Sequence, residues 1–235
     1  MSTNYFITYN GETSRAHGLT VEHRPSVPSA AANVTEFTIP GRDGVLHRDV
    51  GTVQDVEIVI EFALFGMPEK QFAERFRQAT KWLYAKTDQR LFLSDDPNWY
   101  YRVVRVEIGD NVERAHRNGG RFSATFTVRG YVYAVSGNSP TRNYTNHYDT
   151  CRPLYCITGD GYTTLTVNGE SVTVNVGQAV NIDTDKMVTY RPNGTLANAA
   201  LNGDYEKLWL KPGENTISIS SGMTLTVYPR WRKRL

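Results

Sequence analysis

The feature that most constrains the fold is a series of short alternating segments separated by turn-forming dipeptides. Residues 162–167 and 171–176 alternate apolar and polar side chains, and Asn168-Gly169 between them favours a two-residue hairpin turn. Five further short strand-like segments follow, at 179–182, 187–190, 205–210, 215–220 and 224–228. Strands this short and this closely spaced predict an antiparallel β-sandwich or jelly roll.

The first half of the chain is also rich in strand signals, but it contains one helical segment. Over residues 68–86, spacings of three and four residues place Phe72, Phe76, Ala79 and Leu83 on one helical face. The strand-like segments around this helix are 5–9, 19–23, 34–39, 52–62, 90–93, 99–108 and 121–133. The sequence therefore predicts a mainly β fold with one long helix, its N-terminal part a β-sandwich-type domain that carries the helix.

Residues 134–150 interrupt this pattern. They are rich in Ser, Asn and Thr and contain no aliphatic cluster. We therefore expect an N-terminal domain at 1–133, a linker at 134–150 and a C-terminal antiparallel β-sandwich at 151–235.

Charge and hydropathy exclude several classes of protein. The formal net charge is only +2, which argues against a dedicated nucleic-acid binder. No run of 18 apolar residues is present, so we expect no membrane insertion, and the N-terminus lacks the pattern of a secretory signal. Four of the 26 basic residues lie in the last six positions and are candidate contacts for a partner protein: Arg230, Arg232, Lys233 and Arg234.

The sequence shows no cluster typical of catalysis, metal binding or cofactor binding. The histidines and cysteines lack metal-ligand spacing, and nucleophile and phosphate-binding motifs are absent. Asp95-Asp96 before Pro97 is interpreted as a turn, and His47-Arg48-Asp49 as a solvated loop. Cys151 and Cys156 are expected to be unpaired thiols. We therefore expect no enzyme activity, no cofactor and no metal.

One segment carries a family signature. Thr38–Leu46 reads TIPGRDGVL and resembles the signature near the start of siphovirus distal tail proteins. Further pieces of that family's pattern follow in order: Pro153–Gly161, Val167–Gly169, Val180–Asp183, Leu208 with Lys211–Ile217, and Tyr228–Arg232. The resemblance covers nearly the whole chain.

The motif residues suit structural roles. Asp43-Gly44 and Pro212-Gly213 favour tight turns, and Trp231 is a large apolar anchor for the C-terminus. The positions that match the family motif are Pro40, Gly41, Arg42, Asp43, Gly44, Pro212, Gly213, Asn215 and Trp231.

The resemblance implies a structural hub in the virion. Such proteins form a hexameric ring at the distal end of the phage tail, and their C-terminal domains are galectin-like. The ring joins the tail tube to the tail-tip or tail-associated lysin protein and can anchor receptor-binding proteins. The chain would be made in the cytoplasm of a bacterial host, and its 24–33 loop is expected to contact a neighbouring subunit.

Two other functions remain open at this point. Residues 151–235 could be a lectin-like domain that binds carbohydrate during attachment to the host cell wall. A cell-wall hydrolase that uses Asp95 or Asp96 is the third and weakest alternative.

Overall fold

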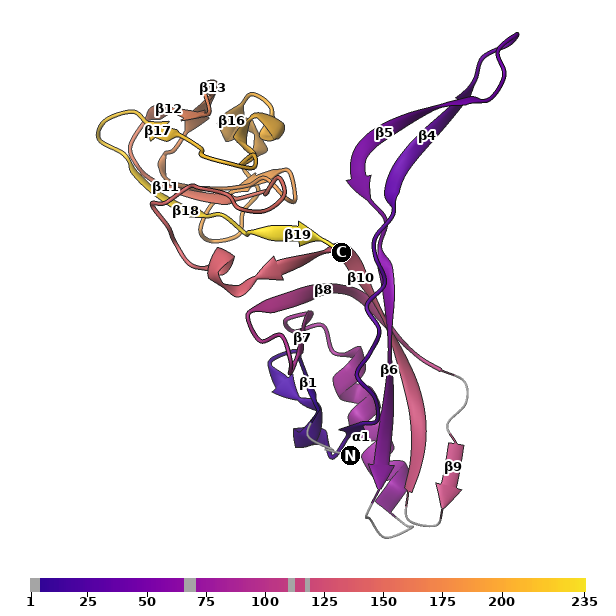
Figure 1. Cartoon of the computed structure of the whole chain (residues 1–235). Coiled ribbons are helices and arrows are strands. Elements are labelled where there is room, and N and C mark those ends of the chain that lie inside the picture. Colours follow the sequence, from indigo (N-terminus) through magenta and orange to yellow (C-terminus); the bar gives the residue numbers. More distant parts are fainter. Residues whose placement is uncertain (1–4, 66–70, 110–112, 117–118) are drawn as a thin grey trace. The chain divides into compact units, whose positions relative to one another are not determined.

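The computed structural model describes residues 5–65, 71–109, 113–116 and 119–235 (Figure 1). The chain divides into two compact units, residues 1–132 with 234–235 and residues 133–233. Each unit has its own hydrophobic core. The segment 134–150, expected as a linker, lies within the span of the second unit.

The first unit is an antiparallel sheet with one α-helix. The order of strands in the sheet is β2-β1-β7-β8-β10-β6-β3, and β9 pairs with β10. The strands of this unit are β1 (Ile7–Tyr9), β2 (Glu12–Thr13), β3 (Thr20–Val21), β4 (Ala32–Thr38), β5 (Val45–Val53), β6 (Val56–Phe65), β7 (Arg90–Leu93), β8 (Trp99–Ile108), β9 (Glu113–His116) and β10 (Gly119–Ala134, which ends in the second unit). A short 3-10 helix, η1 (Ser14–His17), follows β2.

Strands β6 and β10 are neighbours in this sheet and form a long antiparallel pair. They pair continuously from Val56 opposite Val128 to Phe65 opposite Gly119. Alternate residues of β6 point into the core, and Ile58, Ile60 and Phe62 are fully buried. The two-residue period of a strand thus produces the apolar inner face that the sequence predicts.

The helix α1 (Phe72–Tyr84) packs its predicted apolar face into the first core. Phe72, Ala79 and Leu83 are buried and Phe76 packs against the core, as the spacing predicts. Trp82 is also buried and its indole N–H donates to the backbone oxygen of Tyr9 at 3.1 Å. The helix ends at Tyr84 rather than at Lys86, and its predicted start at Pro68 lies outside the described residues.

The dipeptides Asn10-Gly11 and Asn168-Gly169 each form the turn of a β-hairpin. Asn10 and Gly11 connect β1 to β2, and Asn168 and Gly169 connect the strands of a hairpin in the second unit. All four residues have positive φ, between 52° and 84°. This backbone is the one that a two-residue turn of the favoured twist requires.

Strand β5 corrects one prediction. Residues 47–49 are not a solvated loop but lie within β5, which pairs with β4 as a two-stranded sheet. The predicted strand at 52–62 is divided, because β5 ends at Val53 and β6 begins at Val56. The side chains of β5 are exposed over most of its length, so the strand lacks the alternation that marks a half-buried strand.

The second unit is a sandwich of two four-stranded antiparallel sheets, of order β15-β14-β11-β18 and β16-β13-β12-β17. Its strands are β11 (Leu154–Gly159), β12 (Tyr162–Val167), β13 (Glu170–Asn175), β14 (Gln178–Asp183), β15 (Val188–Tyr190), β16 (Leu201–Asn202), β17 (Ile217–Ile219) and β18 (Thr224–Tyr228). The last strand, β19 (Arg232–Arg234), pairs with β10 instead and ends in the first unit. Three 3-10 helices, η3 (Val135–Asn138), η4 (Asn198–Ala200) and η5 (Tyr205–Leu208), complete it. Both sheets contribute buried side chains to one core, among them Tyr155 and Val180 from one sheet and Leu165 and Val174 from the other.

The prediction of a strand at 205–210 is wrong. Tyr205–Leu208 forms η5, held by backbone bonds from Lys207 to Asp204 and from Trp209 to Glu206. Tyr205 and Leu208 are three residues apart, and a 3-10 turn brings both against the core. The predicted mainly β fold class with one α-helix is confirmed for the described residues, and no helix among them is long and apolar enough to cross a membrane.

Candidate functional site

The family-like motif at 40–44 forms the turn of the β4–β5 hairpin. Gly41 and Gly44 both have φ of 80°, and the backbone N–H of Arg42 donates to the oxygen of Ile39 at 3.2 Å. Pro40, Arg42 and Asp43 are exposed. The motif therefore shapes the end of a hairpin and does not line a pocket among the described residues.

The β4–β5 hairpin exposes an unusual number of large apolar side chains. Cross-strand pairing places Phe37 opposite Leu46 on one face, and Glu36 opposite His47 on the other. Six large apolar residues of the hairpin are between 40% and 55% exposed: Val34, Phe37, Ile39, Val45, Leu46 and Val50. A concentration of this kind on so small an element is typical of an interaction surface.

Glu36 and His47 form an ion pair on the face of the hairpin opposite to Phe37 and Leu46. His47 Nδ1 lies 3.5 Å from a carboxylate oxygen of Glu36, and both side chains are more than half exposed. Next to it, the Asp49 carboxylate accepts the N–H of Gly51 at 2.7 Å, where the pairing of β4 with β5 shifts register. His47 and Asp49 thus have structural contacts within the hairpin.

The motif residues near position 213 form a buried junction in the second unit. The Asn215 carboxamide oxygen accepts from the N–H of Lys211 at 2.9 Å and from the Asn168 side chain at 2.7 Å. Its NH₂ group donates to the backbone oxygens of Tyr144, Lys211 and Gly213. Asn215 therefore ties the turn after Pro212 to the β12–β13 turn and to the segment before β11.

Two of the four basic residues predicted to contact a partner are used inside the second unit. Arg230 makes a bidentate ion pair with Asp183, with N–O distances of 2.7 and 3.0 Å. Arg232 is 6% exposed, and its Nε donates to the backbone oxygen of Thr150 at 2.8 Å. Lys233 is exposed, whereas Arg234, in the first unit, donates to the backbone oxygen of Ala30.

Trp231 packs against the second core, although it is half-buried rather than fully buried. Its backbone oxygen accepts the N–H of Ala134 at 2.9 Å. The role of Trp231 as an anchor for the C-terminal segment stays a prediction.

The acidic pair Asp95-Asp96 and the two cysteines have contacts that fit a structural role. Asp95 pairs with Arg24 at 2.6 Å and accepts the Tyr5 hydroxyl at 2.8 Å, while the Asp96 backbone closes a turn, as predicted. Burial and the neighbouring Asp95 carboxylate raise the pKa of Asp96. Both cysteines are unpaired thiols, as expected, and burial raises the pKa of Cys151 to about 11. A thiol with so high a pKa is a poor nucleophile.

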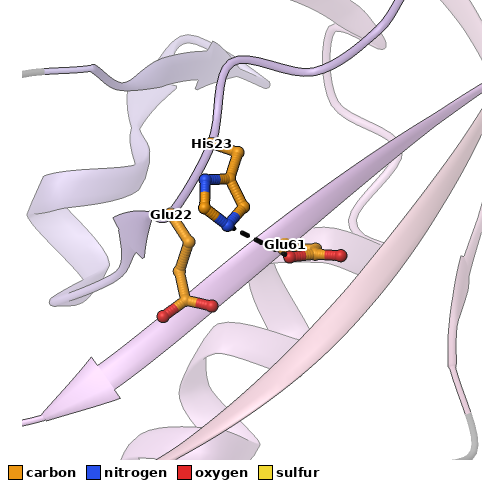
Figure 2. A group of neighbouring side chains, drawn as sticks. All are labelled: Glu22, His23 and Glu61. Carbon is orange, nitrogen blue, oxygen red and sulfur yellow. Dashed lines mark ion pairs between the residues drawn. The ribbon is translucent and has the colours of Figure 1, made fainter.

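Sequence spacing missed one group of possible metal ligands. Glu22 and His23 follow β3, and Glu61 lies on β6 (Figure 2). One donor atom from each of the three lies within 4.8 Å of the others, and within the described part of the chain no other group of three does so. The carboxylate of Glu61 comes from a strand distant in sequence, so no linear motif could reveal the group.

Each unit has a pocket among its described residues. In the first unit, a pocket of about 420 Å³ is lined by Glu12, His17 and Trp82, with His17 stacked on the indole at 4.4 Å. In the second unit, a more polar pocket of about 340 Å³ is lined by Val167, Asn168, Glu170, Asp204, Glu206, Lys207, Trp209 and Lys211.

Comparison with known proteins shows a similarity to one domain family and a shared fold. Residues 18–128 match the model of the phage tail protein RIFT-related domain. No curated protein sequence matches the chain.

Two solved structures share the fold over the full length. The Dit protein of phage SPP1, described as a paradigm of the hub adsorption apparatus in phages that infect Gram-positive bacteria, has 16% identity and a TM-score of 0.67 over 98% of this chain and 99% of that chain. A chain of the phage P2 baseplate, solved in its activated conformation with Ca, has 10% identity and a TM-score of 0.52 over 100% and 99%. Residues 18–128 are thus similar to the phage tail protein RIFT-related domain, and the whole chain shares the fold of the SPP1 Dit protein.

Proposed function

We propose that this chain is a structural subunit of a phage tail, located at the distal end of the virion tail, and that six copies close into a ring. The observation that carries the proposal is the exposed β4–β5 hairpin on a chain that shares its fold over 98% of its length with the SPP1 Dit protein. The role is mechanical rather than catalytic.

The hairpin supplies the contact between copies. An isolated two-stranded hairpin is marginally stable in water, and exposed strand edges invite pairing with another chain. Here both strands are exposed, and Phe37 and Leu46 present a cross-strand apolar pair to solvent. A neighbouring copy of the same chain that covers this face would remove the apolar surface from water. Closed rings arise when each subunit repeats one such head-to-tail contact.

The 24–33 loop was expected to contact a neighbouring subunit, and part of it packs inward instead. Pro25 and Ala30 are buried and Val27 packs against the first core. The exposed positions of the segment, Arg24 and Pro28 among them, lie between the sheet and the hairpin in sequence. The contact of this loop with a neighbouring subunit stays a prediction for these exposed positions.

The ring would join further tail proteins. We propose that one of its surfaces meets the tail tube protein and the other the tail-tip or tail-associated lysin protein, with receptor-binding proteins attached to the assembly. The support for these partners is the resemblance to distal tail proteins. In the C-terminal segment, exposed Lys233 is the best-placed of the four predicted basic contacts.

A pair of substitutions in the hairpin tests the ring. Phe37→Ser with Leu46→Ser should reduce the mass in solution from a six-fold multiple to that of one chain. Both side chains are exposed in the isolated subunit, so its melting temperature should change by less than about 2 °C. Met187→Ser, at a comparably exposed apolar position in the second unit, is the control and should leave the ring intact. A ring that persists in the hairpin variant would contradict this contact.

The polar pocket of the second unit favours a second candidate function, carbohydrate binding. Trp209 lines it together with the carboxylates of Glu170, Asp204 and Glu206. An indole beside carboxylates can stack on a sugar ring and accept hydrogen bonds from its hydroxyls.

A glycan array separates this alternative from the hub. Binding that is present in the wild type, lost in Trp209→Ala and retained in Tyr162→Ala would favour a lectin-like role in host attachment. Tyr162 is the matched control because it is 73% exposed in the same unit but does not line the pocket. No glycan bound by the wild type would remove the alternative.

A further inference from the structure

Two glutamates face each other across the edge of the first sheet. Val21 on β3 is paired with Phe62 on β6, and both are buried on the inner face. The backbone N–H of Glu22 donates to the oxygen of Glu61 at 3.0 Å, so these residues continue the same register. Alternation along a strand then sends both carboxylates to the outer face. The arrangement is fixed by the backbone and does not depend on flexible loops.

Two carboxylates in this relation repel each other unless a cation lies nearby, because like charges directly opposite on paired strands are destabilising. Arg121 on β10 forms an ion pair with Glu22, with an N–O distance of 2.7 Å. Glu61 faces His23 instead, whose Nε2 lies 3.9 Å from its carboxylate oxygen (Figure 2).

We propose that Glu22, His23 and Glu61 form a binding site for a divalent transition metal, with Zn²⁺ as the best match. One imidazole nitrogen and two carboxylates are donors that Zn²⁺ accepts at about 2.0–2.2 Å. Donors at those bond lengths lie about 3.4 Å apart, and the three donor atoms here are already within 4.8 Å of one another. Water would complete the coordination.

Exposed side chains can move the remaining distance that brings the three donor atoms onto one metal ion. The His23 side chain is 79% exposed and that of Glu61 is 56% exposed, so both can rotate toward a shared ion without displacing core residues. Glu22 is only 18% exposed and is the fixed member of the set. Because the imidazole donor suits Zn²⁺ and Ni²⁺ better than Ca²⁺ or Mg²⁺, the site should discriminate between these groups of ions.

The site has a mechanical consequence. His23 lies just after β3, where the chain leaves the sheet on its way to β4 of the hairpin. A metal held between His23 and Glu61 would fasten that departing segment to β6. This inference stands independently of the proposed ring, because all three ligands belong to one copy of the chain.

Isothermal titration of tag-free, full-length protein with ZnCl₂ tests the site. We expect one Zn²⁺ per chain and at least tenfold weaker binding by His23→Ala and by Glu61→Gln, since loss of a ligand should cost no less than loss of an outer-shell partner. Both substitutions are at exposed positions, so circular dichroism should show that the variants fold. CaCl₂ should give no comparable signal.

The chain offers a matched control and a variant with the opposite effect. His47 also pairs with a single glutamate, at 3.5 Å, but is not part of a group of three, so His47→Ala should bind Zn²⁺ like the wild type. Arg121→Gln frees the Glu22 carboxylate and should tighten binding. Unchanged affinity in His23→Ala, loss of binding in His47→Ala, or binding by Arg121→Gln no tighter than wild type would each overturn the assignment.

Discussion

At the scale of single residues, one asparagine side chain in each unit holds the neighbouring loops, half-buried Asn10 in the first and buried Asn215 in the second. Asn10 donates to the backbone oxygens of Trp82 and Ala85 at the end of α1 and accepts from the N–H groups of Asp88 and Gln89. Asn215 plays the same part in the second unit, where it satisfies five backbone or side-chain groups. A carboxamide suits such junctions because it donates and accepts at once.

Replacing Asn215 with Ala should destabilise the protein by about 2–3 kcal/mol, because buried backbone groups lose their partners. Urea denaturation followed by fluorescence measures this change. Asn193→Ala is the control and should cost less than about 1 kcal/mol, since Asn193 is exposed and only one bond to the N–H of Thr195 involves its side chain. Equal costs for the two variants would refute the role of Asn215.

The Arg230–Asp183 pair makes the stability of the protein depend on pH. Burial disfavours the charged carboxylate of Asp183, but its hydrogen bonds and ion pair with Arg230 outweigh this and lower its pKa below the usual value. A depressed folded-state pKa stabilises the fold above about pH 4, and that contribution is lost as the pH falls through the folded-state pKa.

Arg230→Met should remove this acid-sensitive stabilisation and destabilise the protein at pH 7 by about 3–5 kcal/mol, because Asp183 is then buried without its partner. Thermal melts between pH 7 and pH 3 measure both effects. A wild type and variant that lose stability in parallel over the acid range would contradict the linkage.

At the scale of secondary-structure elements, the C-terminal segment is part of the fold rather than a free tail. Arg230, Trp231 and Arg232 all contact the second unit. From composition alone, the last six residues look like a short basic tail. Asp183, the ion-pair partner of Arg230, lies far away in the sequence, so no local pattern indicates the pair. The ion pair forms only once β11 has paired with both β14 and β18, which places Asp183 and Tyr228 on either side of Leu154.

Trp231→Ala should therefore lower stability by about 2–3 kcal/mol, somewhat less than the cost of truncating a fully buried indole. The neighbouring substitution Lys233→Ala should have almost no effect, because Lys233 is exposed. Differential scanning calorimetry of the two variants decides the matter. An unchanged melting temperature for Trp231→Ala would show that the indole does not anchor the segment.

The elements that could be predicted from sequence are those whose signal is local. The Asn10-Gly11 and Asn168-Gly169 turns and the apolar face of α1 follow from a few neighbouring residues. Strand β5 could not be predicted over its full length, because its two exposed faces leave no hydrophobic period. The prediction of a strand at 205–210 was wrong because core side chains three residues apart also fit a 3-10 turn.

The possible metal ligands show the same limit at a site. Glu22 and His23 are adjacent, but Glu61 joins them only through the pairing of β3 with β6. The spacing of histidines along the sequence therefore does not indicate the group. The motif at 40–44, by contrast, was recognisable because its function as a turn depends on consecutive residues.

At the scale of the whole molecule, two units with separate cores form a chain that shares its fold, end to end, with the SPP1 Dit protein. Within the described residues, each unit is held together by apolar packing, by ion pairs and by the hydrogen bonds of asparagine side chains. The apolar surface that one copy leaves exposed on its hairpin is the physical reason to expect assembly. Assembly of the chain with further copies of itself is therefore the central expectation for this protein.

The mass of the purified protein in solution tests this claim most directly. Light scattering coupled to size-exclusion chromatography, repeated over a hundredfold range of concentration, should give six times the 26.5 kDa of one chain at the upper concentrations. Electron microscopy of the same sample should show closed rings. A mass of 26.5 kDa at every concentration, with no ring even when the tail tube protein is added, would contradict the account.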